Sequence, residues 1–169
     1  DTLFYFDGEK RIPKKILNSG DNRFSPAARA KAIVEVSADP QMSSKTMVES
    51  VIQYNLFETS NYLFYGYGYN KKGRMMIYNK STGKQVEIDA QEGIKNNWDG
   101  GPNITLKINK DDNTVFAWVN AFELKAHVAS ETFKNSTPLY PEKKKQLEKL
   151  ANSLNENDNP VLMLVKLKE

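Results

Sequence analysis

The loop at residues 98–103 holds the side chains whose types and spacing best suit ligand chemistry. Trp98, Asp99 and Asn103 stand close together in the sequence WDGGPN. An indole ring can stack on a sugar while a carboxylate and an amide hydrogen-bond its hydroxyl groups. These three residues are therefore the candidate ligand-binding residues. Gly-Gly-Pro also forms tight turns readily, so a turn with Trp98 packed inside is the simpler interpretation of the same sequence.

Catalysis has weaker support in the residue pattern. A glycan hydrolase or lyase would place two carboxyl groups on one cleft, roughly 5 to 9.5 Å apart in glycosidases. Asp99 and Glu58 are the candidate acids for this alternative, although the sequence alone does not bring them together. His127 is the single histidine, and no second histidine or nucleophile motif accompanies it, so we interpret it as structural. We assign no catalytic residue.

We predict no metal site and no cofactor. The chain has no cysteine, which removes thiolate ligands and cysteine nucleophiles. Residues 111–113 and 155–159 are rich in oxygen ligands but lack the spacing of an EF-hand loop, so they are interpreted as turns. Gly66 and Gly68 lack the third glycine of a dinucleotide-binding fingerprint. On a strand, they would instead let a neighbouring sheet or backbone approach closely.

Length, composition and charge narrow the class of protein. The chain has 169 residues, 39% of them hydrophobic, which fits one folded domain. The net charge is only +3 and acidic residues are interleaved with the lysines, which argues against nucleic-acid binding. The longest apolar run, at residues 160–165, is too short to span a membrane. The sequence begins without an initiator Met, so we expect a fragment from which any targeting signal is missing.

Alternation of apolar and polar residues, with frequent turns, predicts antiparallel strands. One helix is expected near the C-terminus, at residues 141–154, where Leu147, Leu150, Ala151 and Leu154 form a stripe at helical spacing. At residues 26–32 we expect one helical turn or a surface crossing. The sequence thus predicts an all-β fold with one C-terminal helix before the last strand. The predicted strands are residues 2–7, 11–17, 47–57, 61–69, 74–78, 84–88, 104–108, 114–122 and 160–168. Residues 47–57 could be helical over part of their length, and residues 123–129 could continue the strand 114–122 past a bend.

Four segments carry a resemblance to a known family. They are DTLFYFDGEKRIPKKIL at residues 1–17, FETSNYLFYGYGYNKKGRMMIYNKSTGK at 57–84, DGGPN at 99–103, and YPEKKKQLEKLANSLNENDNPVLMLVKLK at 140–168. In this order they look like the closing part of the six-bladed β-propeller proteins of Bacteroidetes. Residues 57–88 and 104–128 also look like successive copies of one unit, in the size range of a propeller blade.

The resemblance implies both a fold and a cellular location. The chain would be a partial β-propeller of about two to three antiparallel blades, the C-terminal fragment of a larger propeller. Its open blade edges would favour self-association. The family implies the bacterial cell envelope, in the periplasm or at the surface, with lipid anchoring, and no established enzymatic activity. We therefore expect a non-enzymatic binding or interaction module whose ligand is a glycan or a peptide.

Overall fold

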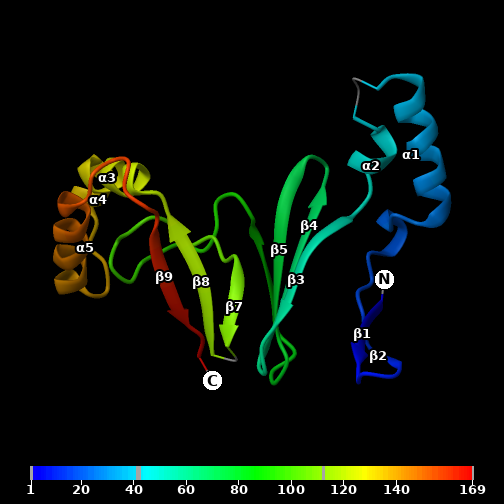
Figure 1. Cartoon of the computed structure of the whole chain (residues 1–169), viewed down its shortest axis with the longest axis horizontal. Coiled ribbons are helices and arrows are strands. Elements are labelled where there is room, and N and C mark those ends of the chain that lie inside the picture. Colours follow the sequence, from blue (N-terminus) through cyan, green and yellow to red (C-terminus); the bar gives the residue numbers. More distant parts are fainter. Residues whose placement is uncertain (1, 41–42, 112, 169) are drawn as a thin grey trace. The chain divides into compact units, whose positions relative to one another are not determined.

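The computed structural model describes residues 2–40, 43–111 and 113–168, which form three sheets and several helices (Figure 1). Two compact units divide the chain: residues 1–55 with 66–74, and residues 56–65 with 75–169. Along the chain the elements are β1 (Thr2–Phe6), β2 (Arg11–Ile16), η1 (Gly20–Asn22), α1 (Pro26–Ala38), α2 (Lys45–Val48), β3 (Ile52–Glu58), β4 (Tyr62–Tyr69), β5 (Lys72–Asn79), β6 (Gln85–Asp89), β7 (Ile108–Asp111), β8 (Thr114–Val119), α3 (Ala121–Ala129), α4 (Glu131–Asn135), α5 (Pro141–Ser153) and β9 (Val161–Lys166).

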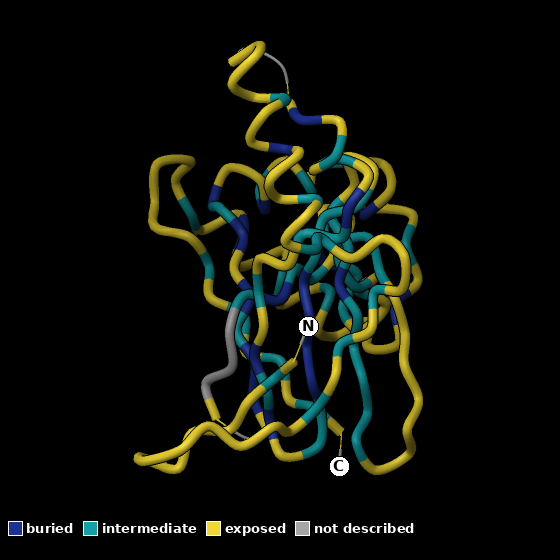
Figure 2. Tube along the Cα trace, turned by 90° about the vertical axis from the view of Figure 1, so that its right-hand side faces the viewer, coloured by how far each residue is buried: buried dark blue, intermediate teal, exposed yellow. Residues whose placement is uncertain are grey.

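The first unit begins with the antiparallel β1–β2 hairpin, as predicted from the aromatic pattern. Asp7 closes its turn, because Oδ1 accepts hydrogen bonds from the amides of Glu9 at 2.9 Å and Lys10 at 2.8 Å. Gly8 supplies the positive φ of +102° that the turn needs. Phe4 and Phe6 on β1 are exposed, and the hairpin as a whole shows little burial (Figure 2). This hairpin therefore leaves apolar surface uncovered.

Helix α1 shows that the prediction of a single helix was wrong. Its thirteen residues run far beyond the single turn expected at residues 26–32. Ser25 caps the helix, since its Oγ accepts from the amide of Ala28 at 3.1 Å, and Pro26 occupies the first turn. The alanine-rich sequence that follows has high helix propensity. These local signals carry the helix through to Ala38.

The four-stranded sheet, in the order β3-β4-β5-β6, confirms the three strands predicted between residues 61 and 88. Asn70 and Lys71 both have positive φ, 50° and 62°, which is the geometry of a two-residue hairpin turn between β4 and β5. On β4, a Cβ at Gly66 would stand 2.9 Å from the Tyr54 ring of the neighbouring strand. The space at Gly66 thus receives an adjacent side chain, whereas we had expected a neighbouring sheet or backbone.

The core of the second unit has two clusters. In the first, Phe57 and Phe64 stack with ring centroids 4.5 Å apart and pack with Met75, Leu106 and Val115. The second cluster lies where the helices meet the last sheet, and its buried members are Val119, Leu124, Val128, Phe133 and Ala151. Helix α5 confirms the helix predicted at residues 141–154, and β9 confirms the final strand.

Helix α3 corrects a second prediction, because residues 123–129 had been expected to extend a strand. The strand β8 instead ends at Val119, and the Glu123 carboxylate accepts a hydrogen bond from the Asn120 amide at 3.2 Å. This is one half of a capping box, which starts a helix. The structure is therefore mostly antiparallel sheet with several helices rather than all-β, and its described residues form neither a closed barrel nor a closed propeller.

In the last sheet β8 pairs antiparallel with both β7 and β9. Val115, Ala117 and Val119 are buried on one face of β8. The opposite face, here called the open sheet face, contains Trp118 paired with Leu162 and Phe116 paired with Leu164. Trp118, Leu162 and Leu164 are 46%, 57% and 56% exposed. A contiguous apolar surface of this kind is typical of an interaction site.

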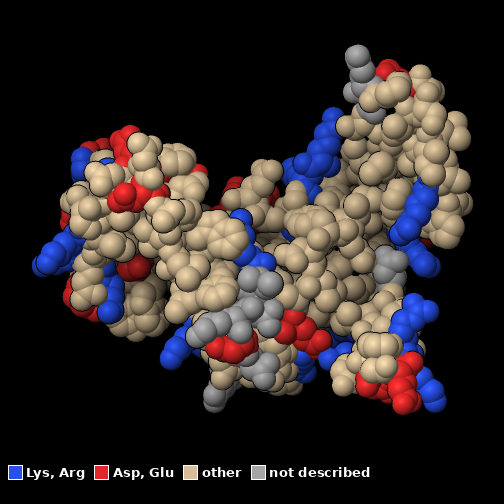
Figure 3. All heavy atoms as spheres, in the orientation of Figure 1, with Lys and Arg blue, Asp and Glu red and all other residues tan. Residues whose placement is uncertain are grey.

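The surface charge is mixed, and the helices were also compared with the length of a membrane span. On the face of the molecule shown in Figure 3, basic and acidic side chains are interspersed among uncharged ones. The expectation that the chain does not bind nucleic acid stays a prediction. None of the helices in the described ranges combines the length and the apolar composition needed to cross a membrane.

Candidate functional site

The loop at residues 96–103 is held in shape by its own polar groups. Asp99 Oδ1 accepts hydrogen bonds from Asn96 Nδ2 at 2.7 Å and from the Gly101 amide at 2.9 Å. Gly100 has a φ of +76°, and its carbonyl oxygen lies 2.8 Å from His127 Nε2 on helix α3. One carboxylate oxygen and one imidazole therefore fix the backbone of this loop.

Trp98 and Tyr140 form an exposed pair of aromatic rings, here called the aromatic platform. The Tyr140 amide donates to the Trp98 carbonyl at 2.9 Å, which brings the start of helix α5 alongside the loop. The ring centroids are 4.2 Å apart and the ring planes are tilted by 40°. Trp98 is 53% exposed and Tyr140 is 39% exposed. The rings support one another and still present surface for a ligand.

The structure separates the roles of the three predicted ligand-binding residues. The simpler interpretation placed the Trp98 side chain inside the turn. In the structure this side chain lies instead on the surface, against Tyr140. Asp99 uses one oxygen to shape the loop. Asn103 is exposed beside the isolated bridge between Ile94 and Ile104. Their part in ligand binding stays a prediction.

Sequence reasoning missed Tyr140. It appeared only as the first residue of the segment 140–168, and nothing in the local pattern links it to Trp98. The link depends on backbone pairing between distant segments, since the Leu139 amide also donates to the Asn97 carbonyl at 2.9 Å. A pairing of this kind leaves no periodic signal in the sequence.

A cleft of about 370 Å³ is lined in part by Pro138 and Pro141, which lie on either side of Tyr140 in the sequence, and we call it the lysine cleft. Lys144 is fixed within it, because Nζ donates to the carbonyls of Ser136 at 2.8 Å and Lys134 at 3.0 Å. The same ammonium lies 4.9 Å from the centroid of the Phe133 ring, a cation–π contact. The residues that line the cleft are Phe133, Lys134, Ser136, Thr137, Pro138, Pro141, Lys144, Lys145 and Glu148.

The two candidate acids are both engaged in local structure. Glu58 forms an ion pair with Lys80, whose ammonium also donates to the Thr59 carbonyl. Asp99 is engaged within its loop as described. These contacts give each carboxylate a structural role and do not assemble a pair of catalytic acids.

His127 and the oxygen-rich turns agree with the structural interpretation. The His127 ring also contacts Phe133 edge-on, at 5.6 Å between centroids. Asp158 Oδ2 accepts from the Asn155 amide at 2.8 Å, which closes the turn after α5. In the turn at residues 111–113, Asp111 Oδ1 accepts from the Asn113 amide at 2.9 Å, and Asp112 lies outside the described residues. Over the described ranges, no group of three or more His, Cys, Asp or Glu side chains is placed to hold a metal ion.

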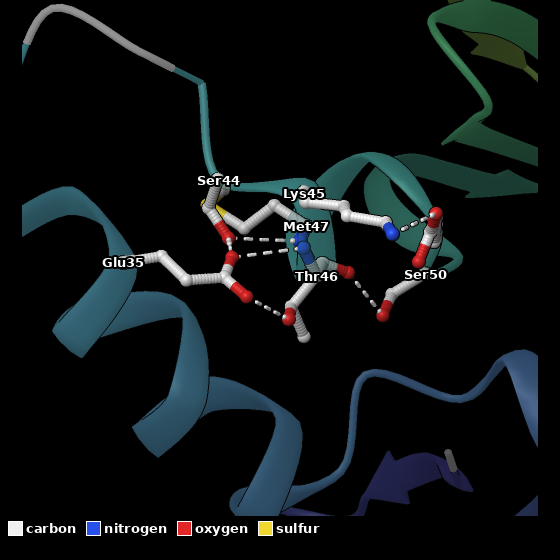
Figure 4. Close-up of polar contacts among 7 residues, drawn as sticks. Glu35, Ser44, Lys45, Thr46, Met47 and Ser50 are labelled. Carbon is white, nitrogen blue, oxygen red and sulfur yellow. Dashed lines mark hydrogen bonds and ion pairs between the residues drawn. The ribbon is translucent and has the colours of Figure 1, made fainter. Parts of the chain in front are cut away.

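A second polar cluster lies in the first unit, where Glu35 of helix α1 meets the start of α2 (Figure 4). Its Oε2 accepts from Ser44 Oγ at 2.6 Å and from the Thr46 amide at 3.0 Å, and its Oε1 accepts from Thr46 Oγ1 at 2.7 Å. These hydrogen bonds, that from the Ser44 hydroxyl foremost, lower the pKa of the Glu35 carboxyl to about 2. An ionised carboxylate with both oxygens occupied ties the two helices together.

Comparison with known proteins places the chain in a family. Residues 1–166 match the family described as Domain of unknown function (DUF4934), and no curated protein matches. The fold is similar to the crystal structure of a "Putative exported protein" from Bacteroides fragilis, with a TM-score of 0.65 and 19% sequence identity. That match covers 99% of this chain and 45% of the other, so this chain spans less than half of the length of the Bacteroides protein. Neither description mentions a propeller, a ligand or a reaction. The chain belongs to the DUF4934 family, a domain of unknown function.

Proposed function

We propose that this chain is a non-enzymatic binding module of the bacterial cell envelope, and that it binds a glycan on the aromatic platform. The observation that carries this proposal is the contact between two exposed aromatic rings, Trp98 and Tyr140, at 4.2 Å. Aromatic faces pack well against the C–H faces of sugar rings, and their polar edges remain free to meet hydroxyl groups. Exposed aromatic residues are also typical anchors of binding surfaces.

Preorganisation of the loop supports the same proposal. The Asp99 side chain and the contact between His127 and Gly100 hold the backbone that presents Trp98. A surface whose shape is fixed before binding loses less conformational entropy when the ligand arrives. Asn103, exposed on the same loop, would add an amide that donates to and accepts from sugar hydroxyls.

The envelope setting is a proposal by analogy of fold. A protein of similar fold from Bacteroides fragilis bears the description exported, and fold alone does not determine location or function. Periplasmic or surface location, with or without a lipid anchor, would bring a glycan-binding surface to the glycans of the envelope.

We also propose that the chain is the C-terminal part of a larger β-propeller. Four strands in consecutive order, β3 to β6, have the arrangement of a propeller blade. The three-stranded sheet exposes an apolar face, as a blade would where its neighbour is missing. A longer protein of similar fold gives room for further blades. The test is the structure of the longer protein in which this chain occurs.

Glycan binding can be tested by screening the chain against a glycan array and then measuring affinity by calorimetry. We expect Trp98→Ala and Tyr140→Ala each to weaken binding at least about tenfold, because each removes half of the platform. Trp118→Ala is the matched control, since Trp118 is similarly exposed but lies on the last sheet. Binding of peptides instead of glycans, or equal losses in all three variants, would refute the proposal.

A further inference from the structure

We propose that the glycan is acidic, and that its carboxylate or sulfate group enters the lysine cleft while a neighbouring sugar ring lies on the aromatic platform. This inference rests on the proposed function and specifies its ligand class. Three lysines line the cleft, Lys134, Lys144 and Lys145, against one carboxylate, Glu148. The balance of charge therefore favours an anion.

The cleft and the platform share one short segment of the chain. Residues 136–141 connect them, with Ser136, Pro138 and Pro141 lining the cleft and Tyr140 belonging to the platform. The loop touches the cleft wall from the other side, because a Cβ built on Gly100 would stand 2.9 Å from Ser136 Oγ. One ligand two or more sugars long could therefore meet both.

The cations of the cleft differ in how firmly they are placed. Lys144 is held by two carbonyl oxygens and stands over the Phe133 ring, so its charge occupies a fixed position. Lys134 forms a 3.0 Å ion pair with Glu131 on its own helix, which partly neutralises it. Lys145 is exposed on α5 and can turn toward a bound anion. Fixed and adaptable cations together suit an anionic group attached to a flexible chain.

Size and neighbouring hydroxyl groups agree with a sugar unit. A volume of about 370 Å³ lies within the range of small-molecule sites, at its lower end. Ser136 Oγ donates to the Phe133 carbonyl at 2.7 Å, which leaves its lone pairs to accept from a sugar hydroxyl. Thr137 adds an exposed hydroxyl at the same wall.

The test compares three probes of similar length on the full chain: oligosaccharides of polygalacturonic acid, of chondroitin sulfate and of neutral dextran. We expect at least one acidic probe to bind about tenfold or more tightly than dextran at low salt, and this preference to shrink in high salt. Comparing the affinities for the polygalacturonic acid and chondroitin sulfate oligosaccharides shows whether a carboxylate or a sulfate group is preferred. Lys145→Gln should lower affinity for the acidic probe about threefold or more. Lys149→Gln, an exposed lysine one turn further along α5 and outside the cleft, should not.

The outcomes separate this inference from the proposed function. Equal affinity for dextran and the acidic probes, still sensitive to Trp98→Ala, would overturn the acidic-glycan inference and leave glycan binding intact. Equal effects of Lys145→Gln and Lys149→Gln on the acidic probe would also overturn it, since general surface charge would then account for the preference. Failure of all three probes and of the glycan array would overturn both.

Discussion

Gly66 occupies a position where a single methyl group would collide with its neighbours. Its Cβ would stand 2.9 Å from the Tyr54 ring and 3.1 Å from Asn55 Cβ. Tyr54 is further held because its hydroxyl donates to the Arg74 carbonyl at 3.3 Å. We expect Gly66→Ala to lower the free energy of unfolding by about 1–3 kcal/mol, because β3 or the Tyr54 ring must move. Urea denaturation would measure the change.

Gly68→Ala is the control for this prediction. Gly68 lies on the same strand and the same face, but a Cβ at this position would have the Ile52 carbonyl oxygen, 4.0 Å away, as its nearest neighbour. We expect a change within about 0.5 kcal/mol there. Equal destabilisation by the two substitutions would mean that this face of β4 excludes any side chain, and that the contact with Tyr54 does not govern the effect.

Glu35 gives the first unit a dependence on pH. Its folded-state pKa of about 2 lies below the ordinary value of 4.5, so ionised Glu35 stabilises the fold. This contribution is fully present above about pH 4.5 and is lost as the pH falls toward 2. We expect the amide of Thr46, which donates to Glu35, to lose hydrogen-exchange protection over this interval.

In Glu35→Gln the protection of the Thr46 amide should be weaker at neutral pH and should change less between pH 4.5 and 2. Glu49→Gln is the control, because the Glu49 carboxylate forms a 3.7 Å contact with the exposed Lys45. This substitution should leave the pH dependence of Thr46 amide protection unchanged. If Glu35→Gln kept the wild-type profile, another group would be responsible for the acid sensitivity.

At the scale of elements, the strands between residues 61 and 88 were predictable because their signals are local. The strand predicted at residues 104–108 was misplaced, since β7 spans Ile108–Asp111. Asn70 and Lys71 form a two-residue turn, and alternating side chains flank it on both strands. The helix signals were equally local but were outweighed in our interpretation. Ser25 and Pro26 begin α1, where we expected one helical turn or a surface crossing. Asn120 and Glu123 begin α3, where we expected the strand to continue past a bend.

The site was only half predictable for a different reason. Trp98 and Asp99 stand in a recognisable Gly-Gly-Pro loop, so sequence alone could name them. Tyr140 and the cleft lysines reach the loop through backbone pairing between residues 97–98 and 139–140. Such long-range pairing follows from how the core packs, which no local pattern encodes. His127 likewise acquires its role from the distant Gly100 carbonyl.

Ser130 joins two helices of the second unit through its side chain. Its Oγ accepts from the Phe133 amide at 3.1 Å as the N-cap of α4 and donates to the His127 carbonyl at the end of α3. We expect Ser130→Ala to lower the free energy of unfolding by about 1–2 kcal/mol. Ser153→Ala, on the exposed last turn of α5, should cost less than about 0.5 kcal/mol. Similar losses, measured by thermal unfolding, would contradict the cap's role.

At the scale of the whole molecule, the open sheet face is an apolar surface that another sheet or a second copy of the chain can cover. The similar Bacteroides structure is more than twice as long as the part this chain matches. If the proposed larger propeller exists, the sheet of a neighbouring blade covers Trp118, Leu162 and Leu164, as sheets stacked face to face do. Studied alone, the chain leaves these side chains in water, where a second copy offers the same apolar surface.

We therefore expect the isolated chain to self-associate through the open sheet face. Leu162 pairs with Trp118 in register, so the double substitution Leu162→Lys and Leu164→Lys places two charges at the centre of that face. This double variant should shift sedimentation equilibrium toward monomer, because burying a lysine at the interface is unfavourable. Leu150→Lys is the control, since Leu150 is exposed on α5 and away from the sheet. If the wild-type chain is already monomeric at high concentration, its open face is not adhesive by itself, and a covering sheet would have to be supplied by the same polypeptide.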